Sequence, residues 1–142
     1  MAKDAGRADE EYDLLRRAAE AGTASGTLLT RLAQVEIGRG LKDAADGHLK
    51  EATALLPQWP IAWLVWGALA ETQARDADAM TRYEHAAAAD PKDPTPLLQL
   101  GRLRLERGDP TQARRDLEKA ASLAPGSATA REAARLLRSM PP

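Results

Sequence analysis

Residues 60–93 read PIAWLVWGALAETQARDADAMTRYEHAAAADPKD, and this stretch is one unit of a pattern that recurs every 34 positions. The prolines mark the interval, because Pro57, Pro91 and Pro125 are each 34 residues apart. The same interval relates further positions at which residue size is kept: Ala45, Ala79 and Ala113; Ala52, Ala86 and Ala120; Leu49, Tyr83 and Leu117; Leu29, Trp63 and Leu97; Leu32, Trp66 and Leu100; and Ala33, Gly67 and Gly101. A period of this length is typical of a solenoid of repeated helical units.

Each unit is predicted to contain two helices separated by a turn. In the first half of the quoted unit, apolar residues recur at helical spacing, namely Ile61, Leu64, Val65, Ala68 and Leu69. The expected turns within the units lie at Arg39–Gly40, Arg75–Asp76 and Gly108–Asp109. At the third turn, Asp109 is suited to cap the next helix, Pro110 to its first position and Gln112 to a capping box. Pro60 and Pro94 mark the expected starts of two first helices.

Small residues at fixed phases indicate how the helices pack. Gly67 and Gly101, with Ala33 at the same phase, allow the second helix of a unit to approach the first closely. Ala79 and Ala86 are expected to do the same from the second helix, toward its own pair and the next pair. Because such contacts join neighbours in sequence, the pattern predicts a quasi-one-dimensional stack.

This pattern resembles the tetratricopeptide repeat, with units at 26–59, 60–93 and 94–127. The resemblance implies an all-α fold, a right-handed α-solenoid of antiparallel helix pairs, within one domain. Residues 1–25 are then a polar segment with a capping helix, and residues 128–142 are a closing helix and tail. The chain departs from the family at Glu36, Ala70 and Arg104, where an aromatic residue is usual, and Gly47 weakens its predicted helix.

The flanking segments are expected to cap the stack at both ends and to complete it. Residues 9–21 are predicted to form an amphipathic helix, since Leu15 and Ala18 lie 34 positions before Leu49 and Ala52. Residues 127–139 are predicted to form the closing helix. Its expected features are Ser127 as the cap, Leu136 and Leu137 facing inward, and Arg131, Arg135 and Arg138 facing outward.

The composition excludes several classes of protein. The 20 Lys and Arg residues nearly balance the 21 Asp and Glu residues, and the sequence pI is about 6.1, which argues against nucleic-acid binding. With no cysteine, there are no disulfides. The apolar runs are too short for membrane insertion, and the N-terminal residues lack the apolar core of a secretory signal. A cytoplasmic location is therefore expected.

The sequence offers little to catalysis or to a cofactor. His48 and His85 are the two histidines, and both are predicted to lie on second helices, facing the convex side. Two histidines without cysteine argue against a metal site. The serines lack a glycine-rich elbow, and Gly101 and Gly108 fit packing and turn positions rather than a phosphate cradle. We expect no catalytic, cofactor-binding or metal-binding residues.

The family resemblance implies that the first helices line a concave groove, and that another protein binds there as an apolar helix or extended segment. The residues predicted to contact this partner are Arg31, Gln34, Ile61, Leu64, Val65, Ala68, Leu98, Gln99, Arg102 and Leu105. Thr27, Thr30, Ile37, Glu71 and Thr95 share the same face. The alternative is that Ile61, Leu64 and Val65 are simply buried, but Trp63 and Trp66 already occupy the core phases.

Other functions remain as alternatives. Some family members clamp the C-terminal carboxylate of heat-shock chaperones, but the matching positions here carry no positive charge: Thr30, Gln34, Val65, Thr95 and Gln99.

Residues 1–90 hold 10 basic and 15 acidic side chains, whereas residues 91–142 hold 10 basic and 6 acidic side chains. This asymmetry suggests a second hypothesis, a scaffold that assembles head to tail as a homo-oligomer. Trp59 is expected to staple two repeats together or to lie on a rim.

Overall fold

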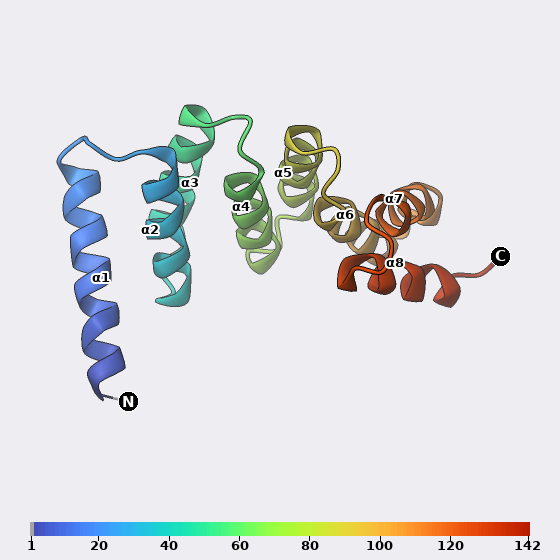
Figure 1. The fold of residues 1–142 in the computed structure, drawn as a ribbon, viewed down its shortest axis with the longest axis horizontal. Coiled ribbons are helices and arrows are strands. Elements are labelled where there is room, and N and C mark those ends of the chain that lie inside the picture. The colour runs from blue at the N-terminus through green and yellow to red at the C-terminus, as the bar shows by residue number, and fades with distance from the viewer. Residues whose placement is uncertain (1) are drawn as a thin grey trace.

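The computed structural model describes residues 2–142, and within these residues it contains eight α-helices and no strand. The helices are α1 (Ala2–Glu20), α2 (Gly26–Gly38), α3 (Lys42–Leu55), α4 (Pro60–Thr72), α5 (Asp76–Ala89), α6 (Thr95–Glu106), α7 (Pro110–Leu123) and α8 (Ala128–Ser139). They follow one another along the molecule, with the chain termini at opposite ends (Figure 1). This is the predicted all-α, right-handed solenoid of antiparallel helix pairs.

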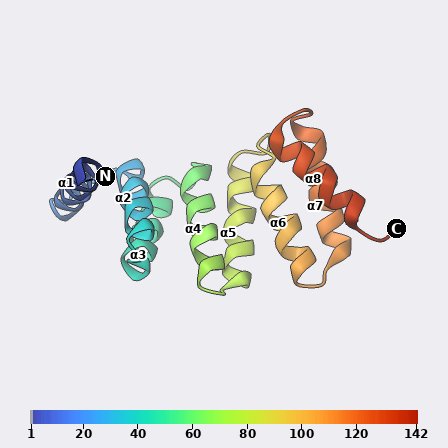
Figure 2. The ribbon, with the colours of Figure 1, turned by 90° about the horizontal axis from the view of Figure 1, so that it is seen from below.

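Three helix pairs form the body of the solenoid: α2 with α3, α4 with α5, and α6 with α7 (Figure 2). We call α2, α4 and α6 the first helices and α3, α5 and α7 the second helices. Helix α1 lies against α2 at one end, and α8 lies against α6 and α7 at the other. The largest buried cluster extends from α4 to α8, whereas smaller clusters join α2, α3 and α4.

The helix starts follow the capping signals in the sequence. Pro60 is the first residue of α4, and Pro110 is the first residue of α7. The Asp109 carboxylate accepts a hydrogen bond from the Gln112 backbone N–H at 3.2 Å, which confirms the predicted cap. The Gln112 side chain instead accepts from Arg115, so it takes part in a contact along the helix.

Close approach within the helix pairs depends on small residues, as predicted. A Cβ at Gly67 would lie 2.6 Å from the Tyr83 ring, and a Cβ at Gly101 would lie 2.5 Å from Leu117 Cγ. The alanines of the repeat pattern are fully buried: Ala45, Ala52, Ala79, Ala86, Ala113 and Ala120. The small residues of the repeat therefore let the two helices of each pair approach closely. The large side chain opposite each small residue fills the space between the helices.

The prediction that Trp63 and Trp66 fill core positions holds only in part, because both residues are half-buried and, of the two, Trp66 packs against the buried cluster of Ala33, Ala45, Leu49 and Leu69. The Trp63 indole donates to the Pro57 carbonyl at 2.9 Å and stacks on His85 with the ring centroids 4.2 Å apart. The Trp66 indole donates to Asp46 at 2.8 Å, and its ring lies beneath the Arg82 guanidinium. An indole N–H needs a polar partner, so these rings lie toward α3 and α5 rather than deep in the core.

Trp59 and His48 both make contacts between neighbouring helices. Trp59 packs beside Leu29, Ala52 and Ala62, which come from three different helices, and this supports its role as a staple. His48 does not point into solvent from the convex side; its Nδ1 lies 2.8 Å from Oε2 of the buried Glu36. The reason is that Glu36 needs a partner on the facing second helix, because an unpaired buried carboxylate is costly.

Of the two end helices, α8 forms as the sequence predicts, whereas α1 is longer than predicted. Helix α8 is capped by the Ser127 hydroxyl, which accepts from the Ala130 N–H, and Leu136 and Leu137 pack on the core as predicted. Helix α1 begins at Ala2, seven residues before its predicted start at residue 9. The additional N-terminal residues are exposed, so no apolar pattern could mark them as part of the helix.

Candidate functional site

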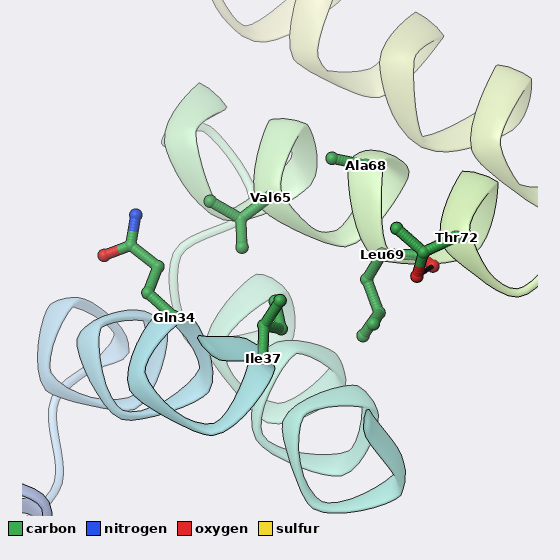
Figure 3. Close-up of a pocket in the computed structure, with 6 residues that line it drawn as sticks. All are labelled: Gln34, Ile37, Val65, Ala68, Leu69 and Thr72. Atoms are coloured by element: carbon green, nitrogen blue, oxygen red, sulfur yellow. Dashed lines mark hydrogen bonds between the residues drawn. The ribbon is translucent and has the colours of Figure 1, made fainter. Parts of the chain in front are cut away.

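An open cavity of about 290 Å³ lies between the first helices α2 and α4 (Figure 3). Its lining residues are Gln34, Ile37, Val65, Ala68, Leu69 and Thr72. Gln34 and Ile37 come from α2, and the other four residues come from α4. Four of the six were predicted to face the groove, so the structure brings this part of the predicted site together.

The cavity has apolar walls because α4 carries apolar residues around its whole circumference. Leu69 is fully buried at its floor, and Ile37 and Val65 pack half-buried around the same cluster. Ala68 and Gln34 are exposed, so they form part of the open side. A recess of this size accommodates one or two apolar side chains of a partner and is at the lower end of typical ligand-pocket volumes.

The alternative that the apolar residues of α4 are simply buried applies to part of the set. Leu64 packs half-buried against the largest core cluster, together with Leu98 and Leu105 of α6. Ile61 differs, since 44% of its surface is exposed near the start of α4. Leu64, Leu98 and Leu105 therefore contribute to the stability of the solenoid and offer a partner only part of their surface.

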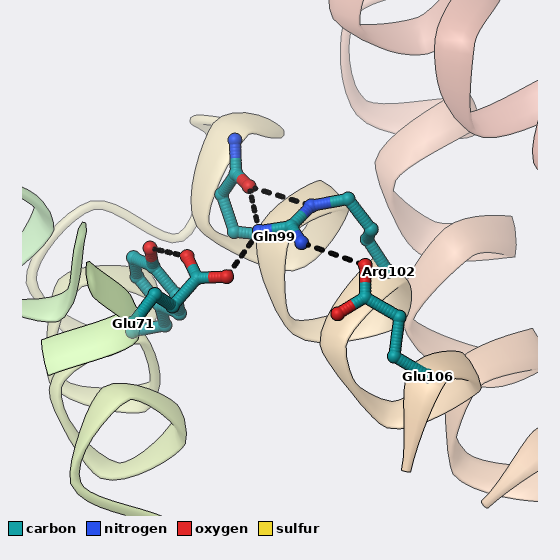
Figure 4. Close-up of polar contacts among 5 residues, drawn as sticks. Glu71, Gln99, Arg102 and Glu106 are labelled. Atoms are coloured by element: carbon teal, nitrogen blue, oxygen red, sulfur yellow. Dashed lines mark hydrogen bonds and ion pairs between the residues drawn. The ribbon is translucent and has the colours of Figure 1, made fainter. Parts of the chain in front are cut away.

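A polar network bridges the next pair of first helices, α4 and α6 (Figure 4). Arg102 Nη2 donates to Glu71 Oε1 at 2.6 Å and to Gln99 Oε1 at 2.9 Å. Arg102 Nη1 donates to Glu106 Oε1 at 3.0 Å. The predicted contact residues Gln99 and Arg102 are thus already engaged, and a partner would have to compete for them.

Glu71 extends this network to the second helix of its own pair. Its other carboxylate oxygen accepts a hydrogen bond from the Tyr83 hydroxyl of α5. Burial and the Glu71 carboxylate raise the pKa of Tyr83 well above its usual range. One carboxylate therefore connects α4, α5 and α6, which fixes the α4–α6 junction by charge-assisted hydrogen bonds.

The polar residues of α2 only partly follow the prediction. Thr30 is 1% exposed, and its hydroxyl donates to the Gly26 carbonyl at 2.8 Å, so it does not face a groove as expected. A threonine can satisfy its hydroxyl on the preceding helical turn, and this allows burial at that phase. Arg31 is exposed and pairs with Glu11 of α1, whose hydrogen bond and charge raise the pKa of the Arg31 guanidinium.

Sequence reasoning missed Leu69 and Thr72 as lining residues, although both follow Val65 at helical spacing. The spacing of 65, 68, 69 and 72 was available as a signal for one continuous face.

Residues 2–142 contain no group of three or more histidine, aspartate or glutamate side chains arranged to hold a metal ion. None of the helices in the same range has both the length and the apolarity needed to cross a membrane.

No protein-family model and no curated protein matches the sequence. Similar solved structures include MamA, at 18% identity over 96% of this chain and 88% of the other, with a TM-score of 0.77. The type III secretion chaperone SycD of Yersinia enterocolitica, in complex with a peptide of the translocator YopD, is 22% identical over 82% and 90% of the two chains, with a TM-score of 0.71. The first tetratricopeptide-repeat domain of Spaghetti (RPAP3), bound to an HSP90 peptide, is 18% identical over 81% and 89%, also with a TM-score of 0.71. The chain thus has the fold of tetratricopeptide-repeat solenoids.

Proposed function

We propose that this protein is a non-catalytic adaptor that binds a segment of another protein on the face formed by its first helices. The observation that carries the proposal is the open apolar cavity between α2 and α4. An apolar side chain of the partner would displace water from this recess, and burial of apolar surface is the main driving force of such association.

The contacts between neighbouring first helices differ along the solenoid, and this difference supports a binding site between α2 and α4 rather than between α4 and α6. The α4–α6 junction is bridged by Glu71 and Arg102, whereas the α2–α4 junction presents apolar walls with Gln34 and Thr72 at the sides. The Gln34 amide can both donate to and accept from the backbone of an extended segment, whereas the Thr72 hydroxyl already donates to the Leu69 carbonyl at 2.7 Å and can only accept. We infer that the partner segment is extended, apolar at one position and largely uncharged nearby.

Two similar folds hold peptides, from YopD in SycD and from HSP90 in RPAP3, and this supports a peptide-binding role for the solenoid. An acidic C-terminal peptide is a poor candidate here, because Gln34, Val65 and Gln99 at the matching positions are uncharged. Thr30, a fourth such position, is buried. The preferred ligand is therefore an apolar segment of a partner protein.

The titratable groups also favour binding over catalysis. Burial raises the pKa of Tyr83 and of Asp116, but each group is tied to a charged residue on a neighbouring helix. Tyr83 donates to Glu71, and Asp116 accepts from Arg104. Burial between packed helices accounts for both shifted pKa values, and neither Tyr83 nor Asp116 lines the cavity between α2 and α4.

The test is to fill the cavity without adding charge. Immobilised protein carrying Ala68→Trp would be compared with wild type in capture from a lysate, with Ala88→Trp on the exposed surface of α5 as the matched control. We expect Ala68→Trp to lose a partner that wild type and Ala88→Trp retain. Equal capture by all three proteins, with circular dichroism confirming their helix content, would exclude the cavity as the binding site.

The scaffold hypothesis receives less support from the structure. Acidic residues of α1 are engaged locally: Asp13 and Glu20 pair with Arg16, Glu11 pairs with Arg31 of α2, and Asp9 pairs with Arg39, which directly follows α2. These local pairs leave the net charge of residues 1–90 unchanged, but they occupy carboxylates that a head-to-tail contact would use. Light scattering that shows a monomer at low salt across a range of concentrations would eliminate head-to-tail assembly.

A further inference from the structure

Helix α1 is attached to α2 mainly through charged side chains. Glu11 accepts from Arg31 Nε at 2.6 Å, and Asp9 accepts from Arg39 Nη2 at 2.7 Å. The Arg39 guanidinium also lies 4.5 Å from the centroid of the Tyr12 ring. All four members of the ion pairs are at least one-third exposed, so solvent and salt weaken each contact.

The apolar contribution to this attachment is small. Helix α1 has no fully buried residue, and its half-buried Ala19 packs on the cluster formed by Leu29, Ala52 and Ala62, whereas α8 at the opposite end buries Ala130 and Ala133. Underneath α1, between it and α2 and α3, is a cavity of about 340 Å³ bordered by Tyr12 and His48 among others. An imperfectly packed, mainly ion-paired helix belongs to the least stable part of a fold and opens before the core does.

The connection from α1 to α2 can act as a hinge. It consists of residues 21–25, and Gly22 adopts a left-handed backbone conformation with φ of +74°. Extended, five residues span roughly 17 Å, which lets α1 leave its position while the rest of the chain stays folded. The surface left behind on α2 and α3 includes Arg31, Arg39 and the apolar side chain of Leu29.

We propose that this surface, the α1 seat on α2 and α3, accepts the α1 helix of a second copy of the chain. The second copy is the natural occupant because its α1 carries the carboxylates of Asp9 and Glu11 and the ring of Tyr12 at the spacing that the seat already binds. The interface is an exchange of identical helices, and it is separate from the cavity between α2 and α4.

The geometry also sets the concentration range of this exchange. A short flexible linker holds α1 at an effective concentration on the order of millimolar relative to its seat. Since α1 is docked in the folded chain, its affinity for the same seat between chains corresponds to a Kd of about 1 mM or lower. Exchange therefore becomes measurable in concentrated samples.

Two full-length variants with complementary defects test the proposal. One carries Asp9→Asn and Glu11→Gln, so its helix is weakened and its seat is intact. The other carries Arg31→Gln and Arg39→Gln, so its seat is weakened and its helix is intact. Mixed at about 1 mM, they are expected to form a heterodimer by sedimentation velocity, while each alone stays monomeric, and added salt should dissociate the complex.

The outcomes decide for or against the exchange. A mixture that remains monomeric overturns the proposal, and so does a dimer that forms equally in each variant alone, since it would not use these pairs. A third protein, the seat-weakened variant with Leu15→Pro in its α1, serves as the control. A heterodimer that survives this helix-breaking change would show that α1 is not the exchanged element and would also overturn the proposal.

Discussion

Glu36 of α2 and His48 of α3 form a contact of 2.8 Å, although the Glu36 side chain is only 2% exposed. The same two phases of the third unit hold Arg104 and Asp116, which form an ion pair whose carboxylate lies on the second helix instead of the first. In the first and third units a polar contact between the two helices of a pair thus stands at the phase where the repeat usually has an aromatic residue, whereas the second unit holds Ala70 there. Burial raises the pKa of Asp116 even though Arg104 lowers it.

Removing His48 should expose the cost of the buried carboxylate. We expect His48→Leu to lower the free energy of unfolding by about 2 kcal/mol, because Glu36 would lose its partner on the facing helix. Urea denaturation followed by circular dichroism measures this change. The double variant Glu36→Leu, His48→Leu should recover most of the loss, since an apolar pair of similar volume removes the unpaired charge. A change below about 0.5 kcal/mol in the single variant would contradict the expectation.

The turn between α4 and α5 offers a stabilising substitution. Ala74 has a positive φ of 56°, at the phase where Gly40 and Gly108 have φ of 78° and 82°. A left-handed alanine costs roughly 1–2 kcal/mol, and glycine recovers this at the expense of unfolded-state entropy. We expect Ala74→Gly to raise the free energy of unfolding by about 0.5–1 kcal/mol. Thermal denaturation measures it, and Gly108→Ala, as the matched reversal, should be destabilising.

The raised pKa of Tyr83 predicts a dependence of stability on alkaline pH. The folded protein favours the protonated phenol, so this stabilisation is complete below the unfolded pKa of about 10 and is lost as the pH rises above it. The variant Tyr83→Phe lacks the phenolic hydroxyl and so cannot titrate at this position. The stability difference between wild type and Tyr83→Phe should therefore decrease above pH 10 in chemical denaturation. A difference that stays constant to pH 11.5 would show that Tyr83 is not buried beside Glu71.

The repeat period predicted the fold correctly because size at each phase decides how the helices pack. Gly67, Gly101 and the buried alanines required only spacing and volume, and both are visible in the sequence. Trp63 was misplaced for the same reason, and Trp66 was placed correctly only in part. The period indicates that a large residue belongs at a phase, but it does not show that an indole needs a hydrogen-bond partner and more space than leucine.

The candidate site could be predicted in part. Gln34, Val65 and Ala68 follow from the helical face, and the structure gathers them around one cavity. The network around Arg102 could not be predicted, because Glu71 lies 31 positions earlier and this separation does not match the period of the repeat. Such contacts depend on the rotamers of long side chains and on the relative position of adjacent helix pairs, and neither is specified by a 34-residue pattern.

The contact between Gly67 and Tyr83 gives the sharpest test of the packing rule. A Cβ at Gly67 would lie 2.6 Å from the Tyr83 ring, so Gly67→Ala should overpack the pair and cost about 1–3 kcal/mol of unfolding free energy. The first unit holds Ala33 and Leu49 at the same two phases, both fully buried.

Transferring that combination, as Gly67→Ala with Tyr83→Leu, should therefore relieve the clash. A double-mutant cycle measured by urea denaturation is expected to show a favourable coupling of about 1 kcal/mol or more between the two substitutions. Tyr83→Leu alone loses the hydroxyl bond to Glu71 and part of the packing on Gly67, so it should be destabilising. Additive effects of the two changes would mean that the residues do not share the space between α4 and α5, and the size-matching rule inferred from the three units would fail at this position.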